Sequence, residues 1–408
     1  MAVTGCKKIT VLFVDAAVEF GGSLRVIGVL VDALDKSRFR PVVVGEVDVN
    51  LLRDFIKGDT LIYKVPRLYN YVHWSKTLDV INQLPDGLLR KVANYLLSAL
   101  RSLMNSVYLV RLARIYLKEG VDIVHVNNGL NNLTPALVSV LLGRKFVVHI
   151  HGMQNPGFIQ KILINKVPKF ITISGFMKLG LIENGFPEER LVVIHNPICS
   201  ADVSPETIID LRKYYSIAED EQVLGIVGRI TRWKGHIEFL KAANRVMQAV
   251  PGLKVIIVGD FSGDSLYRDE IMQLVEASGH KDRIIFTGYV KDVERYYSVM
   301  DVCVHASIEP EPFGLVITEA MASGVAVIAS DRGAPQEIIT AGEDGFLVNP
   351  EDTEKLASTI IRLLGDDGLR SRIAARAKER VLRDYQADDY ARAMERVYLA
   401  VLEDTVQL

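Results

Sequence analysis

Residues 309 to 324 read EPEPFGLVITEAMASG, with three acids, two prolines and a glycine around the start of an apolar stretch. Glu311 and Glu319 lie eight positions apart in this segment, separated by Pro-Phe-Gly and an apolar run. A carboxylate accepts hydrogen bonds from two hydroxyls at once, so Glu319 suits a vicinal diol such as a ribose and Glu311 a second polyol. Either acid alone could instead favour a helix N-terminus electrostatically, but that explanation accounts poorly for the pair. The pattern predicts a helix that begins near Phe313 and a site for a sugar-containing ligand.

A second segment, GRITRWKGH, places two cations in the loop after a predicted strand. Arg229 lies just past the strand and Lys234 five residues further on, before a helix expected to begin near His236. Two such cations repel each other unless an anion lies between them. A diphosphate is the natural anion, because arginine binds it with two hydrogen bonds and lysine acts as a point charge. The alternative is that both are ordinary surface bases, the interpretation that we give to Arg232.

Smaller signals follow three other predicted strands. Gly21 and Gly22 open a helical pattern and would let backbone amides approach a phosphate, although a plain tight turn explains them equally well. His149 and His151 share one face of a strand, but only His151 lies at its exit, so His149 is expected in the interior. Ser174 precedes a helix and suits a cap or a ligand contact. No G-x-G-x-x-G or Walker motif occurs, which argues against a nicotinamide dehydrogenase and a P-loop NTPase.

Short apolar runs alternate with helical patterns along nearly the whole chain. Continuous apolar strands separated by helices are typical of parallel sheets covered on both faces, which bind ligands at the carboxyl ends of the strands. The pattern restarts after residues 192–198, which predicts two doubly wound α/β domains with a junction near residue 197. Charged helical sequence follows residue 351. The runs that we interpret as strands are residues 9–14, 41–45, 121–126, 145–150, 223–228, 254–259, 283–288, 302–306 and 325–330.

The composition argues against several classes of protein. A formal net charge of -2 does not suit a nucleic-acid binder, and nucleic acid is not an expected partner. The three cysteines are scattered without a C-x-x-C pair and no metal-binding motif occurs, so we expect neither disulfides nor a metal. No apolar run reaches about 18 residues, so a cytoplasmic protein without a spanning helix is expected. Residues 85–120 are rich in bases, which fits either a membrane-surface helix or a long pair of helices with solvated arginines.

Taken together, these stretches resemble the retaining glycosyltransferases of family four, which have the GT-B fold of two Rossmann-like domains facing each other across a cleft. EPFGLVITEAMASG matches that family's E-x7-E motif, and GRITRWKGH matches its diphosphate loop. The similarity covers nearly the whole second half, including RIIFTGYV, DRGAPQEII and EDGFLVNPED, and the first half more thinly through EFGGSLRV and HIHG. The linker departs from the family pattern, since Pro197 stands where a glycine usually follows Asn196.

The resemblance implies a role for each candidate residue. Glu311 would contact hydroxyls of the donor sugar, Glu319 would hold the nucleotide ribose, and His151 would lie beside the reacting sugar. Arg229 and Lys234 would hold the diphosphate and stabilise its charge as it departs, in place of a divalent metal ion. Glu311, His151, Lys234 and Arg229 are therefore the expected catalytic residues. The other donor contacts would come from Gly22, Ser174, Phe313, Gly314 and Leu315, the last three through backbone amides.

The resemblance also implies three segments and a reaction. Residues 1–197 would bind the acceptor, residues 198–385 the nucleotide sugar, and residues 386–408 would form a helix that crosses back onto the first domain. The expected reaction moves a hexose with anomeric retention from a nucleoside diphosphate sugar, most commonly UDP-glucose or another UDP-sugar, to a hydroxyl of a glycan, a glycolipid or a small molecule. No carboxylate is placed as a nucleophile, so front-face attack fits best. Polysaccharide biosynthesis is the expected setting.

Two other functions remain as alternatives. A nucleotide-sugar epimerase of the same architecture would need no acceptor, so activity on the donor alone would distinguish it. A non-catalytic sugar-nucleotide binding protein is the second alternative, but the intact set of Glu311, Lys234 and His151 argues against it. Residues 63–76 gather aromatic side chains that could stack on an acceptor sugar or pack on their own domain. The sequence leaves open the acceptor, the oligomeric state and a peripheral contact with the inner face of a membrane.

Overall fold

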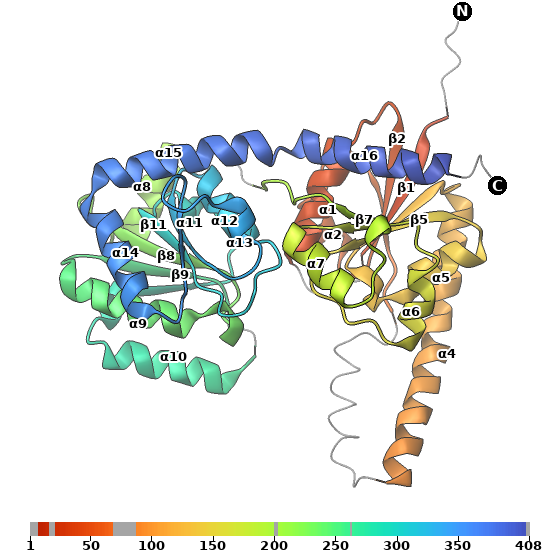
Figure 1. Cartoon of the computed structure of the whole chain (residues 1–408), viewed down its shortest axis with the longest axis horizontal. Coiled ribbons are helices and arrows are strands. Elements are labelled where there is room, and N and C mark those ends of the chain that lie inside the picture. The colour runs from red at the N-terminus through yellow and green to blue at the C-terminus, as the bar shows by residue number, and fades with distance from the viewer. Residues whose placement is uncertain (1–6, 16–20, 68–86, 200–202, 262, 405–408) are drawn as a thin grey trace, which may run out of the picture. The chain divides into compact units, whose positions relative to one another are not determined.

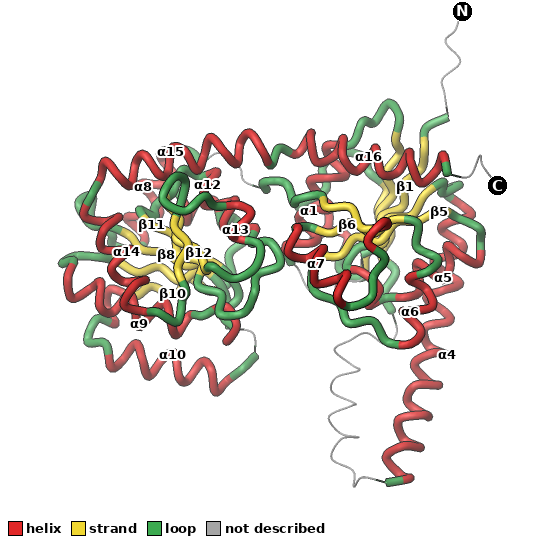
Figure 2. Tube along the Cα trace, viewed as in Figure 1, coloured by secondary structure: helices red, strands yellow, loops and turns green. Residues whose placement is uncertain are grey.

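The structure, a computed structural model, describes residues 7–15, 21–67, 87–199, 203–261 and 263–404. The chain divides into two compact units, each with a parallel sheet between layers of helices (Figure 1). In Figure 2 the yellow strands of each unit lie between red helices. The first unit comprises Met1–Ile173, Met177–Ile194 and Ala387–Leu408, and the second comprises Ser174–Phe176 and His195–Gln386.

The first unit contains a seven-stranded parallel sheet in the order β3-β2-β1-β4-β5-β6-β7. Its central strands are buried on both faces and consist mainly of Val, Ile and Phe, which is the composition expected when helices cover a parallel sheet. The strands are β1 (Ile9–Val14), β2 (Phe39–Gly45), β3 (Leu61–Lys64), β4 (Ile123–Val126), β5 (Lys145–Ile150), β6 (Lys169–Thr172) and β7 (Leu191–Val193). The helices are α1 (Gly22–Ala33), α2 (Val49–Arg53), α4 (Leu88–Lys118), α5 (Leu133–Leu141), α6 (Phe158–Ile164), α7 (Gly175–Glu183) and α16 (Ala387–Glu403). The first two residues of α7, Gly175 and Phe176, belong to the second unit.

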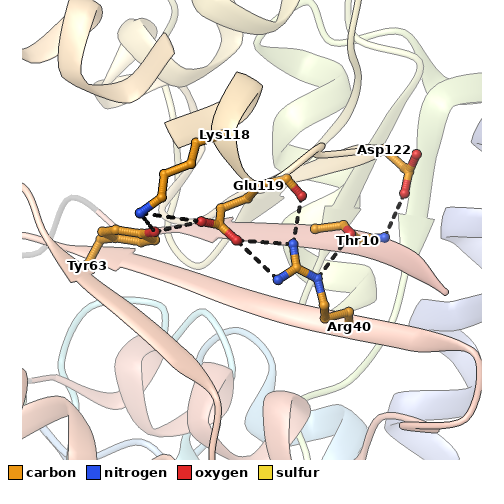
Figure 3. Close-up of polar contacts among 6 residues, drawn as sticks. All are labelled: Thr10, Arg40, Tyr63, Lys118, Glu119 and Asp122. Atoms are coloured by element: carbon orange, nitrogen blue, oxygen red, sulfur yellow. Dashed lines mark hydrogen bonds and ion pairs between the residues drawn. The ribbon is translucent and has the colours of Figure 1, made fainter. Parts of the chain in front are cut away.

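A polar network joins the end of α4 to strands of this sheet (Figure 3). Glu119, directly after α4, accepts hydrogen bonds from Arg40 at 3.1 Å and from the Tyr63 hydroxyl at 2.6 Å. Asp122, just before β4, accepts a hydrogen bond from the backbone N–H of Thr10 at 2.8 Å. Thr10, Arg40 and Asp122 lie at the amino ends of β1, β2 and β4, so this network fixes the sheet at the edge opposite its carboxyl ends.

Two helices of the first unit bear on the expectations from the sequence. Residues 88–118 form one helix of 31 residues rather than a pair of helices, and its amino-terminal part extends away from the sheet in Figure 1. The C-terminal helix α16 packs against α1, and its Glu395 accepts a hydrogen bond from the backbone of Asp35 at 2.8 Å. In the part of the chain that the structure describes, no helix is long and apolar enough to cross a membrane.

The second unit contains a six-stranded parallel sheet in the order β10-β9-β8-β11-β12-β13. Its core forms between the sheet and helices that include α9 and α14, where Phe239 and Ile360 are fully buried. The strands are β8 (Val223–Val227), β9 (Lys254–Val258), β10 (Ile284–Gly288), β11 (Val302–His305), β12 (Ala326–Ser330) and β13 (Phe346–Val348). The helices are α8 (Pro205–Tyr214), α9 (His236–Ala249), α10 (Ser265–Ala277), α11 (Glu294–Tyr297), α12 (Leu315–Ala322), α13 (Pro335–Ile338), α14 (Thr353–Gly365) and α15 (Asp367–Asp384).

The prediction of two doubly wound α/β units is confirmed. Every run interpreted as a strand forms one, with ends shifted by two residues or fewer. β3, β7 and β13 were not predicted, because they are only three or four residues long and partly exposed, so each leaves at most a very short apolar run.

Candidate active site

Two loops at the carboxyl edge of the second unit's sheet bring Lys234 and Glu311 together. β8 and β11 are adjacent parallel strands, so the loops that leave their carboxyl ends are neighbours. Lys234 ends a 3-10 turn between β8 and α9, and Glu311 lies between β11 and α12. Lys234 Nζ donates to Glu311 Oε2 at 2.6 Å in a largely buried ion pair. The sequence suggested that both residues bind a ligand, but it did not predict this contact between them.

Glu311 is 7% exposed, and its carboxylate is hydrogen bonded to two further side chains. Its Oε2 also accepts from His305 Nε2 and from Ser307 Oγ, both at 2.9 Å. Burial alone raises the pKa of Glu311, but the Lys234 charge and the hydrogen bond from His305 outweigh burial and hold this pKa well below its usual range. Glu311 is therefore an ionised, fixed acceptor at neutral pH.

Two glycines with positive φ hold the Glu311 and Lys234 loops in place. A Cβ added at Gly235, where φ is 69°, would lie 1.9 Å from the carbonyl oxygen of Ala306. A Cβ at Gly333, where φ is 84°, would lie 2.5 Å from the carbonyl oxygen of Glu311. The backbone N–H of Glu311 in turn donates to the carbonyl of Arg332 at 3.1 Å. These close approaches admit no side chain and fix the backbone around the ion pair.

Glu319 is the fifth residue of α12, and its side chain is buried. The Tyr297 hydroxyl donates to Glu319 Oε2 at 3.2 Å, which fixes the carboxylate inside the unit. α12 begins at Leu315, two residues later than the sequence indicated, because Gly314 is the N-cap with φ 102°. The first amides of a helix lack intrahelical acceptors, so the backbone of Phe313, Gly314 and Leu315 can bind an anion or a hydroxyl there.

The three cations of the GRITRWKGH segment have different surroundings. Arg232 bonds to Asp264 at 3.2 Å and to Glu270 at 2.7 Å, so it is engaged with surface acids, in line with its interpretation as a surface base. Arg229 lies two residues after the end of β8 and is exposed. Lys234 is the partly buried member of the set.

Ser174 and Glu337 contribute to the same edge of the second unit. Ser174 Oγ donates to the carbonyl of Pro312, next to Glu311, at 2.7 Å. Glu337 accepts hydrogen bonds from the backbone N–H groups of Gly175 at 2.8 Å and Phe176 at 2.6 Å, and from His195 at 3.1 Å. Burial raises the pKa of Glu337, but these hydrogen bonds, first that of His195, lower it below its ordinary value. Glu337 thus provides the acceptor at the start of α7.

The carboxyl edge of the first unit's sheet carries a chain of polar side chains. Asp15, Asn127 and His151 each lie within one residue of the ends of β1, β4 and β5. His151 Nε2 and Asn127 Oδ1 are 2.8 Å apart, and Asn127 Nδ2 donates to Asp15 Oδ2 at 2.6 Å. Asn128 Nδ2 donates to Asp15 Oδ1 at 3.2 Å. His151, as predicted, stands at the exit of its strand, and its partners were not predicted.

His149 lies in the interior, as the sequence indicated. Its Nδ1 is 3.2 Å from His125 Nε2, and His125 Nδ1 is 2.8 Å from the hydroxyl of Tyr398 on α16. Burial lowers the pKa of His125 to about 3 and that of His151 to about 3, so both rings are neutral at pH 7. A line of histidines therefore connects the strand ends to the C-terminal helix.

The glycine pair also adopts the expected position. Gly21 is the N-cap of α1 and Gly22 its first residue, and nothing lies within 4 Å of a Cβ built at Gly21. Of the aromatic segment, residues 68–76 lie outside the described residues, while the Tyr63 hydroxyl bonds to Glu119. No group of three or more His, Cys, Asp and Glu residues suited to a metal occurs within the described ranges.

Sequence reasoning missed His305, Ser307, Asp15, Asn127 and Glu337. Four of these residues end or follow strands that the sequence did predict, at the edge where parallel sheets bind ligands. Listing every polar residue at a predicted strand exit would have found them. Glu337 carries no such signal, because its role depends on a helix start far away in the sequence.

Two family models match the chain in succession. Residues 20–201 match the model described as Glycosyltransferase Family 4, and residues 208–380 match the model described as Glycosyl transferases group 1. The chain belongs to the glycosyltransferase family that these two models describe.

Two individual proteins with similar sequences support this family membership. The chain is 32% identical over 223 residues to an uncharacterized glycosyltransferase of Methanocaldococcus jannaschii, a match to 53% of this chain and 56% of that protein. It is 27% identical over 305 residues to N-acetyl-alpha-D-glucosaminyl L-malate synthase of Bacillus anthracis, covering 72% of this chain and 78% of that protein. The first of these matches spans about half of the relative's length.

A solved structure extends the likeness to the whole fold. An Anabaena protein crystallised with UDP and glucose superimposes with a TM-score of 0.76 and 22% identity, over 96% of this chain and 100% of that protein. The two parallel-sheet units and this match confirm the predicted GT-B fold.

Proposed function

We propose that this glycosyltransferase moves a hexose from a nucleoside diphosphate sugar to a hydroxyl of an acceptor, with retention of the anomeric configuration. The observation that supports this proposal most directly is the buried Lys234–Glu311 ion pair next to the start of α12. The ion pair places a cation that can bind a diphosphate beside a carboxylate that can accept hydrogen bonds from sugar hydroxyls. The Anabaena protein of similar fold was crystallised with UDP and glucose, which favours a uridine diphosphate donor such as UDP-glucose.

Each group of the second unit has a task in this proposal. Lys234 and the exposed Arg229 bind the diphosphate, together with the backbone amides at the start of α12. Glu311 accepts hydrogen bonds from hydroxyls of the donor sugar, since its carboxylate is ionised and fixed. Glu319 binds the ribose diol as the second acid of the E-x7-E motif. Ser174 holds the Glu311 loop through Pro312.

The chemistry that we propose is front-face substitution. The acceptor oxygen forms a bond to the anomeric carbon as the bond from that carbon to the phosphate oxygen breaks, and the departing phosphate oxygen takes the acceptor's proton. Glu311 makes a poor nucleophile, because three donors already hold its carboxylate and its pKa is low. Stabilisation of the departing diphosphate by Lys234 and Arg229 then supplies the main catalytic effect without a metal ion.

The first unit would supply the acceptor side. His151 contacts the reacting sugar, and Gly22 lets the backbone of α1 approach the diphosphate. Glycan and lipid-linked acceptors, as in polysaccharide biosynthesis, remain the expected class for this unit.

A surface of the first unit favours an acceptor at a membrane with anionic lipids. Residues 87–182 contain twelve Lys and Arg against two Asp and Glu, in a chain whose net charge is -2. Within this region the helix α6 exposes Phe158 by 81%, Ile159 by 63% and Ile162 by 54%. Exposed apolar side chains within a sequence region rich in cations are typical of a segment that binds the interface of an anionic membrane. We propose this peripheral contact at the cytoplasmic face as the location of the enzyme.

The donor site is tested by thermal unfolding of the full chain with UDP, GDP, ADP and their sugars, with and without EDTA. A ligand at a hundred times its Kd adds about 2.7 kcal/mol of stability. We expect one nucleotide to raise the melting temperature, in EDTA as well, and Glu319→Gln to lose the effect. A shift that requires a divalent ion would contradict the metal-free site, and no shift with any nucleotide would contradict the donor site.

Product analysis separates the alternatives. With donor alone, release of an epimeric sugar nucleotide would indicate an epimerase. Binding without turnover on any tested acceptor would favour a non-catalytic protein. We expect transfer to an acceptor and retention of the anomeric configuration in the product.

Membrane contact is tested by sedimentation with phosphatidylglycerol or phosphatidylcholine vesicles. We expect binding to the first and little to the second, and loss of binding in the triple variant Phe158→Ser, Ile159→Ser, Ile162→Ser. Leu266→Ser, an exposed apolar residue of the second unit, is the matched control. Equal binding by the triple variant and the control would contradict the proposed surface.

A further inference from the structure

Asp15, Asn127 and His151 are linked by two hydrogen bonds in a row. In each bond the chemistry of the side chains fixes which group donates and which accepts. Asp15 is 2% and Asn127 1% exposed, so neither has bulk water as a ready substitute partner. The contacts are 2.6 Å between Asn127 Nδ2 and Asp15 Oδ2, and 2.8 Å between Asn127 Oδ1 and His151 Nε2. An ionised carboxylate only accepts hydrogen bonds, whereas an amide has one donating and one accepting end.

These directions determine where the His151 proton lies. Because Asp15 can only accept, the amide nitrogen of Asn127 must face it, and the amide oxygen must face the ring. An amide oxygen only accepts, so His151 Nε2 must carry the proton. In a neutral imidazole the other nitrogen, Nδ1, is then a bare acceptor. The carboxylate thus selects one of the two tautomers through the amide.

The neighbouring backbone indicates that this arrangement is built into the fold. Asn128 adopts φ 64°, in the left-handed region that a residue other than glycine rarely occupies. In this conformation its own Nδ2 donates to Asp15 Oδ1 at 3.2 Å. Two consecutive asparagine amides therefore donate to one buried carboxylate, which keeps Asp15 in an acceptor role.

We propose that Asp15 and Asn127 are positioning residues that hold His151 in its Nε2–H tautomer and so present Nδ1 as an acceptor for a hydroxyl of the bound sugar. This inference rests on the proposed function for the role of the hydroxyl, but the tautomer itself does not depend on a substrate. His151 is partly exposed, so its ring is within reach of a ligand at this edge. A ring of the opposite tautomer would present an N–H donor at Nδ1 and could not accept the proton of the hydroxyl in a hydrogen bond there.

The substitution Asp15→Asn tests this directly with almost no change in shape. An asparagine at 15 can accept from Asn127 or donate to it, so the Asn127 amide can turn over. Once turned, its nitrogen faces His151 Nε2 and the ring must carry its proton on Nδ1. Tyr398→Phe is the matched control, because it removes a buried hydrogen bond to His125 in the same line of histidines without changing the partners of His151.

The readout is a long-range proton–nitrogen correlation spectrum of the full chain labelled with 15N-histidine, in which His151→Gln identifies the His151 signals. We expect the Nε2–H tautomer in the native chain and in Tyr398→Phe, and a substantial Nδ1–H population in Asp15→Asn. Turnover of the donor by Asp15→Asn should fall about tenfold, with the KM for the donor changed less than kcat.

A native His151 protonated on Nδ1 would overturn the proposal, as would a tautomer that Asp15→Asn leaves unchanged. A changed tautomer with undiminished turnover would overturn the role of Nδ1 as an acceptor. The spectrum is recorded without substrate, so it separates failure of this inference from failure of the proposed function, which would appear as a lack of transfer by the native chain.

Discussion

The two units place opposite kinds of chemistry at the same position of the same architecture. At the carboxyl edge of the second unit's sheet, an ammonium and a carboxylate are both charged and paired, Lys234 with Glu311. At the carboxyl edge of the first unit's sheet, a neutral imidazole and an amide connect to one carboxylate, Asp15. The sheet topology provides only a carboxyl edge where a ligand can bind. The loop residues at that edge determine whether it suits a diphosphate or a hydroxyl.

The pKa shifts follow the same division. In the second unit, the partners of Glu311 hold its pKa well below the ordinary value, so the charge persists despite burial. In the first unit, burial lowers the pKa of His151 to about 3, and the ring remains neutral. Charges that are paired survive burial, whereas an unpaired titratable ring loses its charge. A charged site suits the leaving group, and a neutral one suits the hydroxyls of a sugar.

The largest test of this comparison is Lys234→Ala. It removes the cation proposed for the diphosphate and leaves Glu311 buried without its closest partner, so we expect kcat to fall about 100- to 1,000-fold. The free energy of unfolding should also fall by about 3 kcal/mol, because a buried charge is left uncompensated. Steady-state kinetics and urea unfolding measure the two effects. Near-native turnover would contradict the role of Lys234 whatever the change in stability.

A control for this loss of stability is the double variant Lys234→Ala, Glu311→Gln. With no carboxylate left to be unpaired, stability should return toward that of the native chain. Turnover should remain low, because both ligand-binding groups are absent. Recovery of turnover would show that the single variant failed only through its fold.

The glycines offer a second way to test the comparison. Gly235→Ala in the second unit forces a Cβ to within 1.9 Å of a carbonyl oxygen at φ 69°, so we expect a loss of about 2–4 kcal/mol in the free energy of unfolding. Gly21→Ala in the first unit meets nothing within 4 Å, and its φ of -154° is open to any residue. It should change the same free energy by less than about 0.5 kcal/mol. Equal effects in urea unfolding would refute the tight packing of the Lys234 loop.

More candidate site residues could be proposed from the sequence in the second unit than in the first. Glu311 and Glu319 belong to one continuous segment, and Arg229 and Lys234 to another, so local spacing was enough to propose all four residues. The first unit's site joins Asp15, Asn127 and His151 from three separate strands. Only the pairing of β1, β4 and β5 brings them together, and no local pattern encodes that pairing.

Two other features of the second unit's site, one contact and one helix start, could not be predicted correctly for a related physical reason. The ion pair between Lys234 and Glu311 depends on β8 lying beside β11, which the order of strands in the sequence does not state. The start of α12 was misplaced by two residues, because the left-handed conformation of Gly314 moves the cap past Phe313. Strand positions were predictable, since buried parallel strands leave continuous apolar runs.

The pH dependence of stability sharpens the contrast between neutral and charged groups. Burial lowers the pKa of His125 from 6.5 to about 3 in the folded chain. Between these values the unfolded chain binds a proton at this ring and the folded chain does not, so stability is complete above pH 6.5 and falls as the pH falls. The slope is about 1.4 kcal/mol per pH unit for one such ring. The lowered pKa of Glu311 affects the pH dependence only at lower pH. The stability that its ionised carboxylate gives to the fold is lost as the pH falls below 4.5, the ordinary pKa of a glutamate.

We therefore expect the urea midpoint to decline already between pH 6.5 and 5, and His125→Gln to decline less steeply over that interval. Glu311→Gln should leave the slope in that interval unchanged. A native midpoint that stays constant from pH 7 to 5 would contradict the neutral, buried state of the histidine.

The smallest effect on turnover and stability is expected for Arg232→Ala, only two residues from Lys234, whose substitution should have the largest effect. Arg232 and Lys234 share one turn, but Arg232 is half exposed and pairs with Asp264 and Glu270 on the surface. Exposed ion pairs contribute little, so Arg232→Ala should move the melting temperature by less than about 2 °C and leave kcat within about twofold of the native value. Differential scanning calorimetry and the transfer assay measure both. If Arg232→Ala lost turnover as Lys234→Ala does, the diphosphate would be bound by the whole basic segment, and burial beside Glu311 would not be what distinguishes the two cations.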